Sequence, residues 1–143
     1  MSGTDGRGDE PLRVPADAGE FADGLAEILR RIPPGPARWL GVAKGWYGLL
    51  IHLHRQILAL DPDYQCQGVD SRYGELVWDC TGAATVTPAI NAAVAAATAK
   101  SLTICERCGR QGQLLNRQGW LTTLCPACSR GGGYRPVTTR SQR

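Results

Sequence analysis

The sequence predicts an α+β protein, in which a small body of helices and one β-hairpin is followed by a short cysteine-containing module. Three observations predict it: two segments carry apolar residues at helical spacing and a third is rich in alanine, two β-prone runs flank a turn, and two Cys-x-x-Cys pairs lie near the C-terminus. We expect a disordered segment over residues 1–17, the body over 18–101, the module over 102–129, and a flexible basic tail over 130–143.

Two amphipathic helices are predicted in the first half of the body. The first starts near residue 18 and ends at the prolines of residues 33–36, which cannot continue a helix. The second covers about residues 45–60 and ends at Asp61-Pro62-Asp63. Their apolar stripes are Phe21, Leu25, Ile28, Leu29 and Ile32 in the first, and Trp46, Leu49, Leu50, Leu53, Ile57 and Leu60 in the second.

A β-hairpin and a third helix complete the predicted body. The β-prone runs 64–69 and 75–80 flank the turn-like stretch 70–74, and we place the apex of the hairpin at Tyr73. Cys66 and Cys80 are equally distant from Tyr73, so they should face each other as small apolar residues, with a disulfide or a second metal as the alternatives. The alanine-rich run 88–101 predicts a helix capped by Thr87, with Pro88 at its first position.

The cysteine spacing predicts a metal site. Cys105 and Cys108 are separated by two residues, sixteen residues follow, and Cys125 and Cys128 repeat the spacing. Each short spacer can turn two sulfurs toward one point, so the two pairs supply the corners of a tetrahedron at about 2.3 Å from a metal. We expect one structural Zn²⁺ in a zinc ribbon or knuckle, with β-strands at 113–115 and 120–124; iron uses the same ligands and remains an alternative.

The chemistry of this site favours a non-enzymatic interaction module. Four cysteines close the coordination sphere, whereas a catalytic zinc keeps one position open for water. The alternative is a thiol–disulfide oxidoreductase that uses one Cys-x-x-Cys pair. No basic start and apolar run of a secretion signal opens the chain, and no run of about 20 apolar residues occurs, so we expect a cytoplasmic protein without a membrane span.

Charge suggests a macromolecular partner, nucleic acid first and protein next, with no small-molecule substrate evident. Residues 1–100 hold nine Lys or Arg and twelve Asp or Glu, whereas residues 101–143 hold seven Arg and only Glu106. A basic surface attracts polyanions. The candidate contacts to nucleic acid are Arg107, Arg110, Arg117, Arg130 and Arg135. For the aromatic and imidazole side chains we expect ordinary roles: core packing for Trp39, Trp46, Trp78 and Trp120, and a surface or partly packed setting for His52 and His54.

The pattern Cys105-x-x-Cys108-Gly109, then Gly119-Trp120-Leu121-x-Thr123-Leu124-Cys125, resembles a family of small uncharacterised zinc-binding proteins of bacteria and phages. In that family a Trp-containing helix and a strand pair precede the metal module, as residues 45–46 and 73–76 do here. The family often ends its ligand set with Cys-x-x-His where this chain has Cys128, and basic residues before its turn are replaced here by residues 70–72. The resemblance implies a metal site and a phage or mobile-element context.

Overall fold

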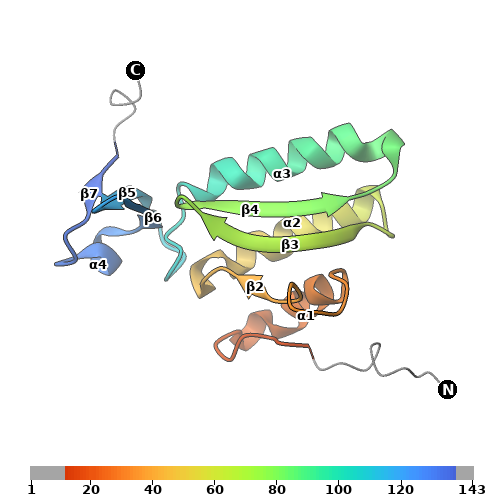
Figure 1. The fold of residues 1–143 in the computed structure, drawn as a ribbon, viewed down its shortest axis with the longest axis horizontal. Coiled ribbons are helices and arrows are strands. Elements are labelled where there is room, and N and C mark those ends of the chain that lie inside the picture. Colours follow the sequence, from red (N-terminus) through yellow and green to blue (C-terminus); the bar gives the residue numbers. More distant parts are fainter. Residues whose placement is uncertain (1–11, 138–143) are drawn as a thin grey trace.

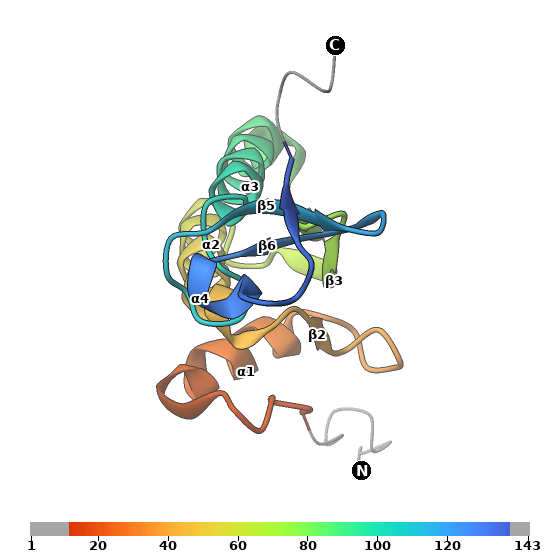
Figure 2. The ribbon, with the colours of Figure 1, turned by 90° about the vertical axis from the view of Figure 1, so that its left-hand side faces the viewer.

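The computed structural model describes residues 12–137, which form a helical body with one three-stranded sheet and a smaller module with another. The module lies at one end of the body, as Figures 1 and 2 show from two directions. This mixed architecture confirms the predicted α+β class. The helices are α1 (Ala22–Arg30), α2 (Tyr47–Leu60), α3 (Thr87–Ser101) and the short α4 (Pro126–Ser129); the strands are β2 (Leu40–Gly41), β3 (Gln65–Arg72), β4 (Glu75–Thr81), β5 (Gln113–Arg117), β6 (Trp120–Leu124) and β7 (Arg135–Pro136).

The core of the body lies between its helices and one face of its sheet. Helix α2 contacts both α1 and α3, and α3 also contacts β4, so α2 and α3 cover the same side of the strands (Figure 1). The predicted stripe of α2 is largely buried, with Leu50, Leu53 and Ile57 fully inaccessible, although Leu60 at its end is exposed. Burying such side chains contributes about 1.5–3 kcal/mol each, which makes this helix the centre of the body's stability.

The predicted hairpin forms, with its turn at Tyr73 and Gly74. Strands β3 and β4 are antiparallel, and Cys66 and Cys80 are register partners as predicted. The predicted apex at Tyr73 is wrong, however: Arg72 pairs with Glu75, so the hairpin is centred between Tyr73 and Gly74, and a register shift between Cys66 and Gly68 brings the two cysteines opposite each other. Both are free thiols, and Cys66 is buried, which agrees with two small apolar residues on adjacent strands. The two-residue β2 adds to β3 in parallel and completes the order β2-β3-β4.

Helix α3 starts at the threonine that we expected to cap it. Thr87 is already helical because the 3₁₀ turn Ala84–Val86 runs directly into the helix, and its hydroxyl donates back to the Ala83 carbonyl over 3.1 Å. The N-cap prediction is therefore wrong, while the helix itself is confirmed. On its inner side, Ser101 Oγ accepts from the Leu76 amide over 3.0 Å and Thr98 Oγ1 donates to the Leu76 carbonyl over 3.2 Å, so two hydroxyls satisfy the backbone of Leu76 in β4.

The second sheet, ordered β6-β5-β7, packs against the tip of the first hairpin. Thr123 is buried and its hydroxyl donates to the Gly74 carbonyl over 2.7 Å. Gly74 has φ +81°, and a Cβ at this position would overlap Leu114 and press on the backbone of Thr122. Only glycine combines this conformation with such a close approach. The module is therefore docked on the body rather than tethered to it.

Both chain ends depart from the predicted disorder where the structure describes them. The two apolar side chains of this short stretch, Leu12 and Val14, pack on the core of the body. The Tyr47 hydroxyl also donates a hydrogen bond to Asp17 over 2.8 Å. At the other end, β7 pairs with β5 through Arg135 opposite Asn116. The predicted flexible tail is thus wrong for this strand, and residues 1–11 and 138–143 lie outside the described part of the chain.

Three side chains occupy environments other than those predicted. His54 is only 1% exposed, and its ring nitrogens lie 2.6 Å from the Tyr64 hydroxyl and 3.1 Å from Glu27 Oε1, so it is a buried, hydrogen-bonded residue rather than a surface one. Trp39 and Trp120 are 50% and 74% exposed, so their predicted core packing is wrong, although Trp46 and Trp78 are buried. No helix within residues 12–137 has the length and hydrophobicity that crossing a membrane requires.

Candidate metal centre

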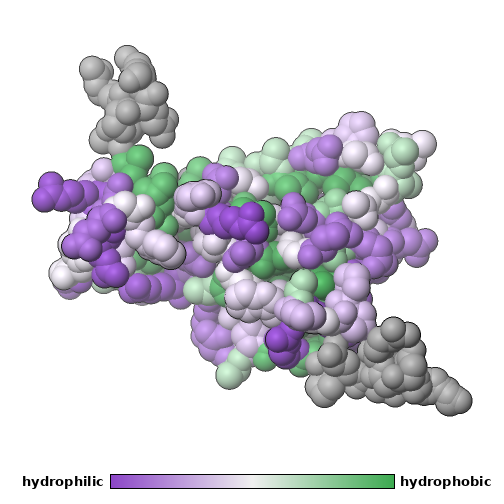
Figure 3. Space-filling view, in the orientation of Figure 1, coloured by the Kyte–Doolittle hydropathy of each residue, from purple (hydrophilic) through white to green (hydrophobic). Residues whose placement is uncertain are grey.

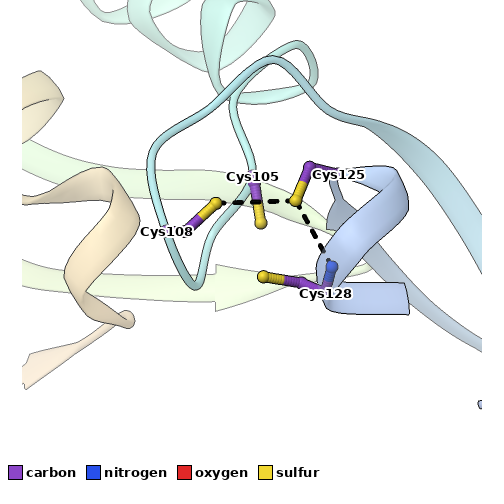
Figure 4. A group of neighbouring side chains, drawn as sticks. All are labelled: Cys105, Cys108, Cys125 and Cys128. Carbon is purple, nitrogen blue, oxygen red and sulfur yellow. Dashed lines mark hydrogen bonds between the residues drawn. The ribbon is translucent and has the colours of Figure 1, made fainter. Parts of the chain in front are cut away.

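The first cysteine pair lies on a tight loop between α3 and β5. The Cys105 amide donates to the Arg110 carbonyl over 2.7 Å, and the Gly109 amide donates back to the Cys105 carbonyl over 2.9 Å. Gly109 has φ +84°, a conformation that glycine adopts without penalty, as expected for the residue that closes a cysteine knuckle. This loop turns the sulfurs of Cys105 and Cys108 toward the same point (Figure 4).

The second pair is carried to the first by the β5–β6 hairpin. Strand β6 ends at Leu124, Cys125 follows as the N-cap of α4, and Pro126 occupies the first helical position, where its missing N–H costs least. The helical turn places the Cys128 amide 3.4 Å from Cys125 Sγ, to which it donates. The local fold thus fixes the second pair as it does the first.

The four sulfurs form a compact cluster of the size that a metal ion requires. All lie within 4.8 Å of one another, and the Sγ atoms of Cys108 and Cys125 are 3.5 Å apart. For metal–sulfur bonds of about 2.3 Å, a regular tetrahedron has edges of about 3.8 Å. The cluster is therefore close to the geometry of a four-coordinate thiolate site, and the four predicted cysteines together can hold a metal ion.

The electrostatics of the cluster call for a cation. The backbone N–H of Cys128 lowers the pKa of the Cys125 thiol to about 6, whereas hydrogen bonding to Cys125 and Cys105 raises the pKa of Cys128 to about 12. A thiolate at Cys125 is therefore favoured, whereas a second one at Cys128 is disfavoured because like charges at this separation repel. A divalent cation removes that conflict and allows the remaining thiols to ionise.

Very little apolar material surrounds the cluster. Cys105 and Cys125 are buried with Leu115 and Leu124, and Tyr134 packs on them from the segment before β7. The sequence suggested that Trp120 also belongs to this small core, but its indole lies at the surface. With so few buried side chains, the module needs a further source of folding free energy.

Glu106, between the first two cysteines, joins the module to the body in a way that the sequence did not indicate. Its carboxylate accepts from the Ala43 amide over 3.1 Å and from the Ser71 hydroxyl over 3.2 Å, while its backbone carbonyl accepts from the Gly45 amide over 2.7 Å. Partial burial raises the pKa of this carboxyl group. The partners lie over 30 residues away in the chain, so no local pattern could have predicted the contact.

The five arginines predicted to contact nucleic acid are all exposed and lie on several parts of the module. Arg107 Nη1 donates to the Cys128 carbonyl over 3.2 Å, and the Arg117 guanidinium lies 5.2 Å from the centre of the Tyr134 ring. Both side chains thus brace the module as well as carrying charge. Arg110 follows the first knuckle, Arg130 follows α4, and Arg135 lies in β7.

Comparisons with protein-family models, with curated proteins and with solved structures found no match for this chain. The class of protein is therefore defined by the fold and the site alone: an α+β chain whose C-terminal module carries a tetracysteine cluster able to hold a metal ion.

Proposed function

We propose that Cys105, Cys108, Cys125 and Cys128 bind one Zn²⁺ whose role is structural. The convergence of the four sulfurs carries this proposal. An all-thiolate set suits a soft or borderline ion, and two symmetrical knuckles favour zinc over an iron–sulfur cluster. Since four protein ligands saturate a tetrahedral ion, no position remains for the water molecule that a catalytic zinc activates.

Elemental analysis of protein purified without added metal tests this proposal. We expect one equivalent of zinc per chain, and loss of that zinc in the Cys128→Ser variant. Cys80→Ser is the matched control, because Cys80 is partly buried in the first hairpin and lies outside the cluster. One equivalent of iron, seen also by its visible absorption, would show that the bound metal is iron and not zinc. A metal-free protein with an ordered module would contradict the proposal of a structural metal site.

We further propose that the zinc-closed module is a non-enzymatic interaction surface, with nucleic acid as its first candidate partner. The exposure of all five arginines supports this, as does the near absence of acidic residues after residue 100. Affinity for DNA or RNA should then fall steeply between about 50 and 200 mM salt. The resemblance to small bacterial and phage proteins and the reducing conditions that thiolates need suggest a cytoplasmic setting. One stoichiometric protein partner in a pull-down, without nucleic-acid binding, would favour the protein alternative.

The competing function is thiol–disulfide exchange. It gains some support from Cys125, which caps a helix and accepts the Cys128 N–H, an arrangement that stabilises a thiolate. An oxidoreductase should react rapidly with a disulfide probe while metal-loaded. We expect instead slow labelling of four thiols that becomes fast only after a chelator is added; rapid labelling without chelator would reverse the assignment.

A further inference from the structure

A hollow separates the tips of the two hairpins at the junction of body and module. Its volume is about 530 Å³, within the range of sites that hold small ligands or parts of larger ones. Four consecutive residues of the first hairpin, 71–74, form one wall, and four of the second, 119–122, form the other, with Glu106 also in the lining. We call this hollow the inter-hairpin groove.

Two aromatic rings stand at the groove. Tyr73 is 80% exposed and Trp120 is 74% exposed, and both line it. Tyr73 also has φ +54°, a left-handed backbone conformation. The first residue of such a two-residue hairpin turn is usually Asn or Gly. The two-residue turn itself accounts for this conformation, since Gln118 has φ +55° at the same position of the second hairpin. It does not account for the exposure of the Tyr73 ring, which buries little apolar area. An exposed aromatic ring that lines a groove offers a flat apolar face on which a ligand can stack.

Positive charge accompanies the rings. Arg72 lines the groove, with its Nε 3.7 Å from the Asp70 carboxylate. Arg117 lies beside the lining: it is the cross-strand partner of Trp120, on the same face of the second sheet, and its guanidinium lies over the Tyr134 ring. The lining also contains a negative group, the Glu106 carboxylate, which is partly buried and already accepts hydrogen bonds from the Ala43 amide and the Ser71 hydroxyl. In the space-filling view, hydrophilic side chains cover much of the module, with apolar surface showing between them (Figure 3).

We propose that the inter-hairpin groove binds single-stranded nucleic acid, with unpaired bases stacking on Tyr73 and Trp120 and phosphates meeting Arg72 and Arg117. This inference rests on the nucleic-acid function proposed above and assigns it a site and a substrate class. Aromatic platforms flanked by arginine bind single strands with little sequence preference, since every base has a flat face. A duplex hides those faces by stacking its own bases, so it gains only the contacts to phosphate.

Fluorescence anisotropy with the full-length, metal-loaded protein tests the assignment. The probes are a labelled mixed-sequence oligonucleotide of about 12 nucleotides, as DNA and as RNA, and the blunt duplex of the same sequence, at about 50 mM salt. We expect tighter binding of the single strands than of the duplex. Tyr73→Asn and Trp120→Thr should each weaken single-strand binding at least about five-fold, the effect of losing one stacked base.

The variants separate binding from folding. Asn suits the left-handed turn better than Tyr, so Tyr73→Asn should melt at or above the wild-type temperature while binding less tightly. Trp39→Thr is the matched control: Trp39 is half exposed but does not line the groove, so its loss should leave affinity unchanged. Equal affinity for the duplex, or normal binding by folded Tyr73→Asn and Trp120→Thr, would overturn the proposal.

Metal content measured on the same samples keeps the two proposals distinguishable. Zinc-loaded protein that binds no oligonucleotide at the low salt would refute both the nucleic-acid function and the groove assignment and leave the structural zinc centre standing, whereas binding that Tyr73→Asn and Trp120→Thr leave unchanged would refute the groove assignment alone. Metal-free protein that still binds single strands through Tyr73 and Trp120 would refute the structural zinc centre and leave the groove assignment standing.

Discussion

Replacing Cys105 by serine should unfold the module while the body stays folded. Cys105 is fully buried and supplies one of the four clustered sulfurs, so Cys105→Ser removes a ligand at the centre of the site. Structural zinc sites contribute apparent free energies of about 10–16 kcal/mol to small modules. The two buried leucines of the module, Leu115 and Leu124, contribute about 3–6 kcal/mol together. Coordination of the proposed zinc would therefore outweigh the apolar core of the module.

Amide hydrogen exchange followed by mass spectrometry or NMR measures this effect region by region. In the wild-type protein, the Glu106 amide donates to the Thr123 carbonyl and the Gly112 amide to the Thr103 carbonyl, so both should be protected. In Cys105→Ser, or after a chelator, we expect both to exchange at nearly unprotected rates. Helix α2 should keep its protection, because its contacts are made within the body.

Cys80→Ser is again the control, since it removes a thiol without touching the cluster. Retained protection across residues 103–128 in metal-free protein would refute the reasoning. It would mean that docking of the module on the body, through Glu106 and the tip of the first hairpin, supplies enough free energy without a metal.

Three further predictions concern stability measured by urea denaturation. Gly74→Ala should destabilise by about 2 kcal/mol or more because it adds a steric clash to a positive φ, whereas Gly119→Ala, with open space around it, should cost only about 1 kcal/mol; equal losses would contradict this. Burial lowers the pKa of His54 below its value in the unfolded chain. The contribution of the neutral His54 to stability should therefore be fully present above about pH 6.5 and be lost as the pH falls below that value. His54→Phe should flatten this pH dependence. Ser101→Ala should cost about 1–2 kcal/mol by leaving the Leu76 amide without its partner; no loss would show that water replaces the hydroxyl.

Local patterns predicted the elements well because each is determined by nearby residues. The apolar stripes of residues 21–32 and 46–60 match the buried faces of α1 and α2, apart from Leu60. The turn-like composition before Glu75 predicted the hairpin, but symmetry about Tyr73 predicted only the Cys66–Cys80 pair and not the register near the turn, because an irregularity after Cys66 shifts it. The spacing of the four cysteines predicted their convergence for the same reason, since each two-residue spacer forms a turn of its own.

What could not be predicted depends on contacts between distant segments. Strand β7 forms because β5 offers a free edge and Tyr134 anchors the chain beside it; the short run 134–137 after three glycines is a weak signal for a strand. The exposure of Trp120 follows from its place at the start of β6, away from the small cluster core. Neither position is set by hydrophobic periodicity, which is why the sequence predicts a flexible tail and a packed indole instead.

The two hydroxyls that α3 presents to Leu76 also bear on how copies of this chain meet one another. Strand β4 is the last in its sheet, and an outermost strand is where a foreign polypeptide most easily attaches and starts a fibre. Around Leu76 an incoming strand must first break two bonds made within the same molecule. Helix α3 thus disfavours the pairing of a further strand with the outer edge of β4.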